Sequence, residues 1–268
     1  MGGGGGGLCG ETLWRWAWSG WESSSMSYGV FDEGVAATYD VTCSAMYDDA
    51  VLLPTVEVLA ELAGDGRALE FAVGTGRVAL PLSARDIAVS GIELSRPMVD
   101  QMMAKPGAER IPVTIGDMTT TRLDDTFGLV YLVYNTISNL LTQDEQVECF
   151  RNAATHLDVG GHFVVEMFVP ELRRLPVDET FVPFDVTSSH LGFDEYDVLN
   201  QRLVSHHYWI ADGRVKTFDS PHRYAWPAEY DLMARLAGMS LCERWSNWHR
   251  EPFTANSTSH VSVWEKTE

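Results

Sequence analysis

Short apolar runs alternate with helix-like segments through the first two thirds of the chain. Apolar runs of this kind, bounded by turn residues, are typical of strands buried in a parallel sheet. The runs lie at residues 69–73, 87–93, 111–115, 127–134 and 162–168. Helical patterns fill the intervals, and Thr142-Gln143-Asp144-Glu145 is a capping box that opens one of them. This alternation predicts an α/β fold with a doubly wound, Rossmann-like parallel sheet.

The pattern changes after residue 168. Residues 201–210 and 214–218 alternate apolar and polar positions about Ala211-Asp212-Gly213, which indicates an antiparallel hairpin. We expect this hairpin to belong to an inserted antiparallel sheet at about residues 180–226. Its period of two puts His206 on one face and His207 on the other. A helix at 228–236 and strands at 241–248 and 260–265 follow the insertion.

Residues 1–35 show no sustained period and combine the run Gly2 to Gly7 with several tryptophans. We interpret this segment as a disordered extension, the alternative being an aromatic docking patch. A helical pattern follows over 36–64, and Pro54 should kink or divide it. Tyr39 lies in this pattern, where it either folds over a ligand or packs as a half-buried tyrosine. The sequence thus predicts one domain over residues 36–268 with the insertion inside it.

A glycine-rich turn follows the first predicted strand. Gly74 and Gly76 permit a tight turn and let a ligand lie against bare backbone, next to the free N–H groups of the following helix. Residues 74–79 satisfy the dinucleotide fingerprint G-x-G-x-x-G/A. Residues 70–76 are instead similar to motif I of class I S-adenosylmethionine (SAM) methyltransferases, E/D-x-G-x-G-x-G, with Ala72 in place of the first glycine. The turn therefore predicts a nucleoside-bearing cofactor without deciding which one.

Acidic residues end the second and third predicted strands. Glu93 and Asp117 reach the same edge of the sheet as the glycine turn, because parallel strands share the direction of their carboxyl ends. A carboxylate at Glu93 can accept both hydroxyls of a ribose, and one at Asp117 can accept an adenine amine. Met98 and Met118 lie beside these positions, where they either flank the adenine ring or fill the core.

The charge of the chain limits its partners. The 38 acidic residues outnumber the 19 lysines and arginines and give a net charge of −19, which argues against nucleic acid and against an anionic membrane surface. The four cysteines form no CxxC pair, and we predict no metal site. The chain shows no apolar run long enough to cross a bilayer and no basic region followed by an apolar one at its start. We expect a cytoplasmic protein.

With these motifs in this order, residues 36–268 resemble a class I SAM-dependent methyltransferase. Their layout is similar to that of deoxyamino-sugar N,N-dimethyltransferases. The resemblance implies a seven-stranded sheet whose last strand is antiparallel. It implies SAM as cofactor, with its methionine part beside Gly74 and Gly76, its ribose on Glu93 and its adenine at Asp117 and Met118. The expected cofactor-binding residues are Tyr39, Glu70, Ala72, Gly74, Gly76, Glu93, Leu94, Met98, Asp117, Met118 and Tyr134.

The expected reaction is methylation of an amine or hydroxyl on a small-molecule acceptor, such as a sugar or secondary metabolite, beneath the inserted sheet. Methyl transfer mainly needs alignment and exclusion of water, and a hydroxyl acceptor also benefits from a general base. His206, His207 and Tyr134 are the catalytic candidates, and the hairpin can also pair two subunits in a homodimer. The alternatives are an NAD(P)-dependent oxidoreductase, although the sequence lacks the Tyr-x-x-x-Lys relay, and a SAM-binding module without turnover.

Overall fold

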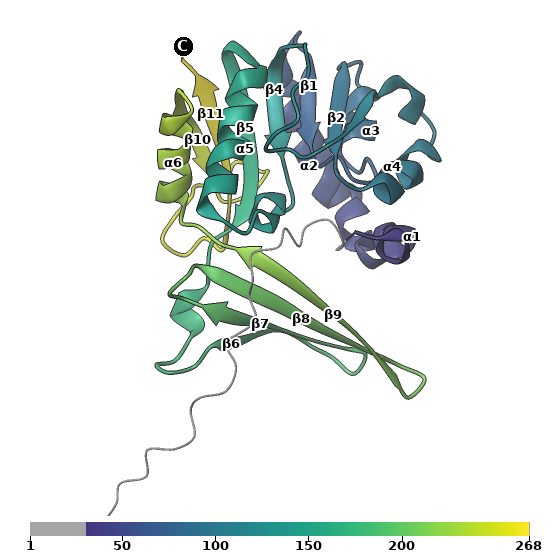
Figure 1. The fold of residues 1–268 in the computed structure, drawn as a ribbon, viewed down its shortest axis with the longest axis vertical. Helices are drawn as coiled ribbons and strands as arrows, with labels where there is room; N and C mark the ends of the chain where they lie inside the picture. Colours follow the sequence, from purple (N-terminus) through teal and green to yellow (C-terminus); the bar gives the residue numbers. More distant parts are fainter. Residues whose placement is uncertain (1–30, 268) are drawn as a thin grey trace, which may run out of the picture.

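The computed structural model describes residues 31–267 of the chain and contains two sheets (Figure 1). Helices cover both faces of the larger sheet, and the smaller sheet lies at one end of this body, below the carboxyl ends of its parallel strands. Most of the segment predicted as an extension, residues 1–30, lies outside the described residues. Helix α1 begins at Glu33, so the folded domain starts before the predicted boundary at residue 36.

The larger sheet has seven strands in the order β10-β11-β5-β4-β1-β2-β3. Strands β1 to β5 pair in parallel, and β11 runs antiparallel to both β5 and β10. This arrangement confirms the predicted Rossmann-like sheet with an antiparallel last strand. The strands are β1 (Ala68–Phe71), β2 (Val89–Glu93), β3 (Val113–Ile115), β4 (Phe127–Leu132), β5 (Leu157–Phe168), β10 (Met239–Trp245) and β11 (Ser259–Lys266).

Two hydrophobic clusters, one on each face, hold the helices to this sheet. Cys149 of α5 and Met233 of α6 pack on one face, and Leu59 of α2 and Leu82 of α3 pack on the other. All four side chains are almost fully buried, as the core faces of amphipathic helices should be. The helices are α1 (Glu33–Thr42), α2 (Asp49–Ala63), α3 (Ala79–Ser83), α4 (Arg96–Met103), α5 (Gln143–His156) and α6 (Pro227–Leu236).

The break in the first helical segment does not fall at Pro54. The chain leaves α1 at Cys43, passes through the 3-10 turn η2 (Ser44–Tyr47) and enters α2 after Asp48. Asp48 has an extended backbone, and its carboxylate accepts the N–H of Ala50, so it caps α2. Pro54 lies inside α2. The segment was predicted to kink or divide at Pro54, but it divides earlier, because α1 ends at Cys43 and Asp48 caps the start of α2.

The insertion forms a separate antiparallel sheet of four strands in the order β6-β7-β8-β9. Strands β8 (Arg202–Ala211) and β9 (Arg214–Arg223) form the predicted hairpin. The sequence pattern did not separate β6 (Phe181–Val186) from β7 (His190–Asp197), since β6 is mostly apolar and contains a proline, and β7 mixes apolar with polar and acidic residues without strict alternation. The structure thus confirms an inserted antiparallel sheet and adds two strands to the predicted hairpin.

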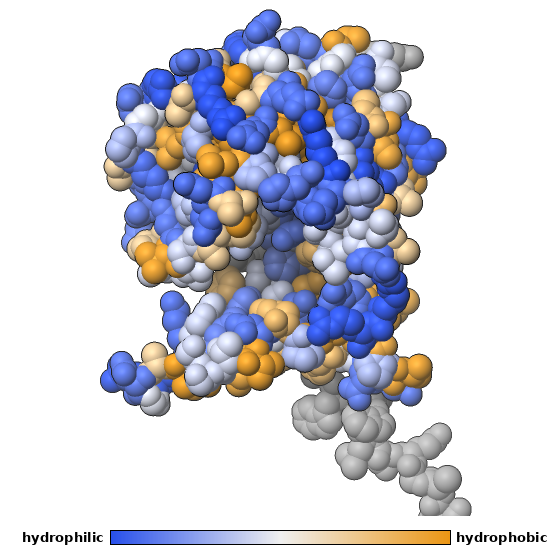
Figure 2. All heavy atoms as spheres, turned by 180° about the vertical axis from the view of Figure 1, so that it is seen from behind, coloured by the Kyte–Doolittle hydropathy of each residue, from blue (hydrophilic) through white to orange (hydrophobic). Residues whose placement is uncertain are grey.

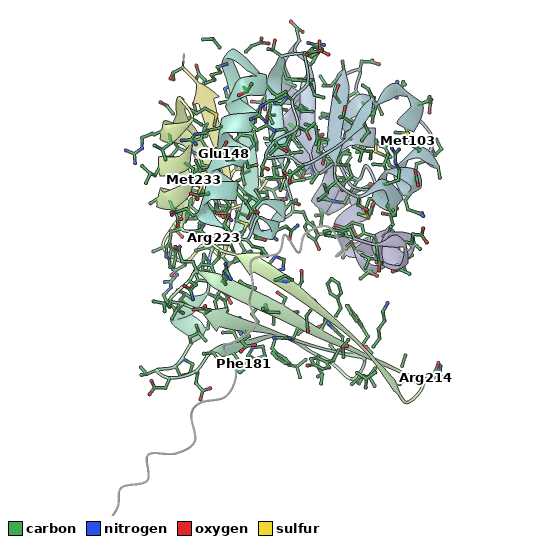
Figure 3. All side chains as sticks on the ribbon, in the orientation of Figure 1. Met103, Glu148, Phe181, Arg214, Arg223 and Met233 are labelled. Carbon is green, nitrogen blue, oxygen red and sulfur yellow. The ribbon has the colours of Figure 1, made fainter. Side chains whose placement is uncertain are left out.

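Arg223 fastens the inserted sheet to the main body where β9 ends (Figure 3). Its guanidinium lies 2.6 Å from Oε1 of Glu229 in α6 and donates to Oε1 of Gln146 in α5, also at 2.6 Å. Gln146 in turn donates to the carbonyl oxygen of Arg223. The Arg223 side chain is 5% exposed, so this ion pair is held largely out of water and fixes where the inserted sheet begins to leave the body.

His260 of β11 is a fully buried histidine at the end of the core. Its Nδ1 lies 2.8 Å from the Ser262 hydroxyl, and among residues 31–267 its Nε2 has no hydrogen-bond partner. Burial, together with the positive charge of Arg244, lowers the pKa of His260 to about 3, although Asp231 opposes this shift. The folded protein therefore keeps His260 neutral at pH values where the unfolded chain binds a proton.

We expect this difference to reduce stability as pH falls below about 6.5. Between pH 7 and pH 5 the contribution of His260 to the free energy of unfolding should fall by about 2 kcal/mol, because only the unfolded state takes up the proton. In His260→Asn the loss of stability between these pH values should be smaller by that amount, measured by urea unfolding. The exposed His249→Asn serves as control, and equal losses in wild type and His260→Asn would contradict the assignment.

Candidate functional site

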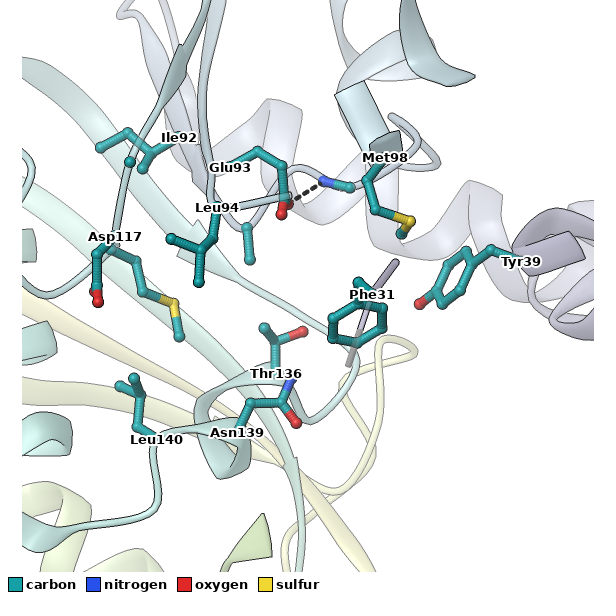
Figure 4. A pocket seen from close by; sticks show the side chains of 14 residues that line it. Phe31, Tyr39, Ile92, Glu93, Leu94, Met98, Asp117, Thr136, Asn139 and Leu140 are labelled. Carbon is teal, nitrogen blue, oxygen red and sulfur yellow. Dashed lines mark hydrogen bonds between the residues drawn. The ribbon is translucent and has the colours of Figure 1, made fainter. Parts of the chain in front are cut away.

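A cavity opens at the edge where the carboxyl ends of β1, β2, β3 and β4 meet (Figure 4). It encloses about 720 Å³ of empty space, part of it open to solvent. We call it the first cavity. The lining residues are Phe31, Tyr39, Ala72, Gly74, Ile92, Glu93, Leu94, Met98, Gly116, Asp117, Met118, Thr136, Asn139 and Leu140.

Glu93, the last residue of β2, is fixed at the centre of the lining. Its Oε2 accepts the N–H of Gly74 at 2.8 Å, and its Oε1 accepts the N–H of Ser95 at 2.7 Å. The side chain is nearly buried, and burial raises its pKa although the hydrogen bonds from Ser95 and Gly74 oppose this. Since an ionised carboxylate can accept about four hydrogen bonds, each oxygen retains acceptor capacity on the cavity side.

The structure does not bring Glu70 to this lining. Glu70 lies inside β1 and points to the face of the sheet that α2 and α3 cover, where the Tyr131 hydroxyl donates to it at 2.9 Å. Burial raises the pKa of Glu70 to about 8, even though Tyr131 and Arg77 favour its charged form. The expected role of Glu70 in binding the cofactor is therefore corrected: as an internal strand residue it faces the core.

Gly76 also lies outside the lining, and packing explains why it is glycine. Its φ is +80°, and a Cβ there would lie 2.8 Å from the Met102 side chain and 3.1 Å from that of Leu80. Gly74 does line the cavity, with a φ of +58°. Of the two glycines, Gly74 faces the space and Gly76 lets the turn close onto the helices behind it.

Asp117 and Met118 line the end of the cavity that lies beyond Glu93, and Met98 lines it at the start of α4 (Figure 4). Oδ1 of Asp117 accepts both the N–H and the hydroxyl of Thr119, at 2.7 and 2.6 Å. Its Oδ2 has no hydrogen-bond partner within residues 31–267. Asp117 and the neighbouring Met118 thus put an acceptor group and a thioether at this end of the site, whereas Met98 lies on the other side of Glu93 (Figure 4). Contact with a cofactor stays a prediction.

The N-terminal segment supplies the remaining wall. The rings of Phe31 and Tyr39 lie 6.1 Å apart, edge to face, and the Ser95 hydroxyl donates to the carbonyl oxygen of Phe31 at 2.6 Å. Helix α1 is held to the glycine turn by Asp40, whose carboxylate accepts hydrogen bonds from Thr75 at 2.6 Å and pairs with Lys105 at 2.5 Å. Phe31 falls in the segment predicted as an extension, so the sequence reasoning missed it.

A second cavity lies between the main body and the inserted sheet, where Figure 2 shows the molecule hollowed. It encloses about 1260 Å³ of empty space, part of it open to solvent, and it shares Phe31, Tyr39, Thr136 and Asn139 with the first cavity. The rest of its lining is aromatic, polar and acidic. These residues are Tyr134, Asn135, Ser138, Phe168, Phe184, Asp194, Leu203, Ser205, His207, Phe218, Ser220 and His222.

The two predicted histidines lie on opposite faces of β8, as the period of two required. His207 faces the second cavity and stacks on His190 and Trp209, with ring centroids 5.2 Å apart in both pairs. His206 points to the outer face, where it contacts Asp219 at 2.8 Å and Glu195 at 3.1 Å. His206 therefore lines neither cavity, because it lies on the opposite face of the sheet, and the geometry favours His207 of the two predicted histidines.

Tyr134 lines the second cavity, together with Tyr39, but it does not line the first. Burial raises its pKa to about 12, although Arg77, with its guanidinium 5.4 Å from the ring centroid, favours the phenolate. Tyr134 and Asn135 both have positive φ, +56° and +62°, which is uncommon outside glycine. Tyr134 is thus a wall residue of the second cavity, and its catalytic role stays a prediction.

The 3-10 turn η4 (Thr136–Asn139) after β4 carries residues that the sequence reasoning missed. Thr136 and Asn139 line both cavities, and Ser138 lies 3.0 Å from Nδ1 of His222 in β9. The weak signal for them was a run of small polar residues after a buried strand. Among residues 31–267, no three His, Cys, Asp or Glu side chains gather as metal ligands, and no helix is long and apolar enough to cross a membrane.

Comparison with known proteins gives a consistent picture. Residues 68–161 match the model of a methyltransferase domain. The solved CcbJ methyltransferase from Streptomyces caelestis is 33% identical, with a TM-score of 0.78, and the match covers 91% of this chain and all of that one. The cypemycin N-terminal methyltransferase of a Streptomyces species is 27% identical over 241 residues, which cover 88% of this chain and 98% of the relative.

A further match concerns the fold. CalS10, an amino pentose methyltransferase from Micromonospora echinaspora solved with bound SAM, has a TM-score of 0.68 at 20% identity, and the match covers 86% of this chain and 97% of that one. At this identity the likeness shows that the two chains share their architecture.

The network at Asp40 predicts how the N-terminal wall is held. Partial burial alone would raise the pKa of Asp40, but hydrogen bonds from Lys105, Thr75 and Tyr47 outweigh it and hold the pKa below its ordinary value. In Lys105→Met we expect amide hydrogen exchange in residues 33–42 to accelerate about tenfold or more, while exchange in β1 is unchanged. Lys216→Met is the matched control on the inserted sheet, and equal exchange in both variants would show that Lys105 does not hold α1.

Proposed function

The chain belongs to the class I SAM-dependent methyltransferases, and we propose that it methylates the nitrogen of an amine on a small secondary metabolite. The dehydrogenase alternative is wrong, because a relative that matches over nearly the whole chain is a methyltransferase. Support for the proposal comes from the two adjoining cavities with four shared lining residues. A cofactor in one and an acceptor in the other meet at that boundary.

The first cavity fits the adenosine part of SAM by the chemistry of its lining. Glu93 offers two fixed carboxylate oxygens to the two ribose hydroxyls, and Oδ2 of Asp117 offers an acceptor to the adenine amine. Ile92, Leu94 and Leu140 give an apolar surface for the ring. When bound, SAM supplies an electrophilic methyl carbon on a sulfonium sulfur. The protein has to align a nucleophile with that carbon and exclude water.

The second cavity favours an amine over a hydroxyl as the acceptor. Asp194 is the one carboxylate in its lining, which also contains aromatic rings such as those of Phe184 and Phe218. Burial raises the pKa of Asp194, against the hydrogen bond from Ser205, so a cationic group beside it would be bound favourably. Aromatic faces attract ammonium groups as well. Two of the relatives support the same choice, since one is named as an N-terminal methyltransferase and the other as an amino pentose methyltransferase.

The proposed transfer balances without another reactant. An acceptor that binds as an ammonium ion first loses its proton to water, since only the neutral amine has a lone pair. That lone pair forms the new N–C bond, the electrons of the broken S–C bond stay on sulfur, and the methylated product is an ammonium ion that loses a proton to water. Homodimerisation through the inserted sheet and a cytoplasmic location stay predictions. The experiment for the function is a methylation assay with SAM on a panel of amino sugars, peptides with a free N-terminus and their hydroxyl analogues. Methylation of the hydroxyl analogues alone would contradict the proposal.

We expect Glu93→Gln to weaken binding of S-adenosylhomocysteine about 10- to 100-fold, because a charged acceptor for two hydroxyls is replaced by a neutral amide. Isothermal titration measures this affinity directly, and Glu57→Gln on the exposed face of α2 is the matched control. Unchanged affinity in Glu93→Gln would remove the ribose assignment. Binding of NAD by the wild type, with no binding of SAM or S-adenosylhomocysteine, would contradict the proposed cofactor site.

Asp194→Asn should raise KM for amine acceptors of the panel about tenfold, since the neutral amide loses most of its attraction for an ammonium ion. The affinity for S-adenosylhomocysteine should not change, because Asp194 lies outside the first cavity. Asp219→Asn is the matched control on the outer face of the same sheet. Equal KM values in Asp194→Asn and wild type would show that the acceptor does not contact this carboxylate.

A further inference from the structure

His222 is a half-buried histidine that none of the sequence arguments singled out. It lies near the end of β9, faces the second cavity and contacts η4, the turn whose Thr136 and Asn139 also line the first cavity. Its ring therefore stands next to the boundary at which acceptor and cofactor would meet. His207 lies further along the sheet, in β8, and its Nδ1 is engaged by Nε2 of His190 at 3.1 Å.

The hydrogen bonds around Ser138 determine which ring nitrogen of His222 carries the proton. The Ser138 hydroxyl is 2.7 Å from the carbonyl oxygen of Asn135, to which it donates. A hydroxyl has one proton, so its oxygen is left to accept the contact of 3.0 Å from Nδ1 of His222. Nδ1 is thus the protonated nitrogen. Nε2 keeps its lone pair, and within residues 31–267 it has no hydrogen-bond partner.

The surroundings keep this ring neutral. Burial and the neighbouring His207 lower the pKa of His222 to about 4, so the ring is uncharged near pH 7. Asp194 is the carboxylate of the cavity lining, and Tyr134 and His207 are its other titratable groups close to η4 and β9. A neutral ring with a free lone pair accepts a hydrogen bond from a donor but does not compete with an amine for a proton.

We propose that Nε2 of His222 accepts a hydrogen bond from the N–H of the acceptor amine and so aims the nitrogen lone pair toward the first cavity. This inference rests on the proposed N-methylation. A neutral amine has N–H donors and one lone pair. A hydrogen-bond acceptor at this position engages an N–H group of the amine and leaves the nitrogen lone pair free for attack. A hydrogen-bond donor there would instead bind the lone pair and block the attack. The Asn135-Ser138-His222 chain thus selects the reactive orientation of the nucleophile.

The tautomer of His222 can be tested without any substrate. Nitrogen-15 NMR of the histidine rings should show His222 protonated at Nδ1 in the wild-type protein, and Ser138→Ala should shift the ring toward the Nε2-protonated form. His206 on the outer face is the internal reference, and its signals should not change. A wild-type His222 protonated at Nε2 would overturn the inference, because that ring has no lone pair to offer to the amine.

Two substitutions of His222 distinguish a role in positioning the amine from a role in packing. Asn at position 222 places an amide where Nδ1 was and keeps the contact with Ser138, whereas Gln places a polar atom near the position of Nε2. With the best amine of the panel we expect His222→Asn to lower kcat about 10- to 100-fold and His222→Gln to recover part of it. Affinity for S-adenosylhomocysteine should stay within about twofold in both variants, which also reports that they fold.

The possible outcomes test the role of His222 separately from the proposed N-methylation. If the wild type methylates amines and both variants keep its kcat, the role of His222 is refuted while N-methylation stands. If both variants lose affinity for S-adenosylhomocysteine together with activity, His222 is a packing residue and the inference fails. If the wild type methylates hydroxyls and no amine of the panel, the proposed function itself fails, whatever the variants do.

Discussion

The architecture of the site depends on one carboxylate that accepts two backbone N–H groups. Glu93 joins the glycine turn after β1 to the first residues of α4, through Gly74 and Ser95. Ser95 caps α4 and also holds the carbonyl oxygen of Phe31, so the N-terminal wall follows from the same contact. Three segments that are distant in the sequence thereby meet at one point. A nearly buried carboxylate that stays hydrogen-bonded can fix their positions, because leaving those N–H groups unpaired would be costly.

The boundary between the two cavities depends on two residues with left-handed backbone conformation that follow β4. After β4, Tyr134 and Asn135 adopt positive φ, a conformation that costs free energy for non-glycine residues and is found mostly at functional sites. Glu166 accepts the N–H of Tyr134, and Asn135 accepts the N–H of Phe168, so β5 stabilises this bend. The bend turns η4 toward the inserted sheet. The backbone strain is thus balanced by hydrogen bonds and sets the boundary between the cavities.

Much of this arrangement could be predicted from the sequence because burial on both faces makes parallel strands visible as apolar runs. The end of β2 at Glu93 followed from that pattern, but the direction of Glu70 did not. Glu70 lies inside its strand, between two residues that face the opposite cluster, so it points into the core. The orientation of the inserted sheet was not predictable either. The period separated His206 from His207, but only packing against the body shows which face meets the cavity.

The opposed faces of β8 also bear on how such an enzyme changes over evolution. Its inner positions line the second cavity, and its outer positions are spaced between them along the same strand. The first cavity is lined by residues outside the inserted sheet. If the acceptor binds in the second cavity as proposed, substitutions at alternate positions of the insertion would change acceptor preference and leave the first cavity intact. One scaffold of this kind can supply many metabolic pathways with the same chemistry.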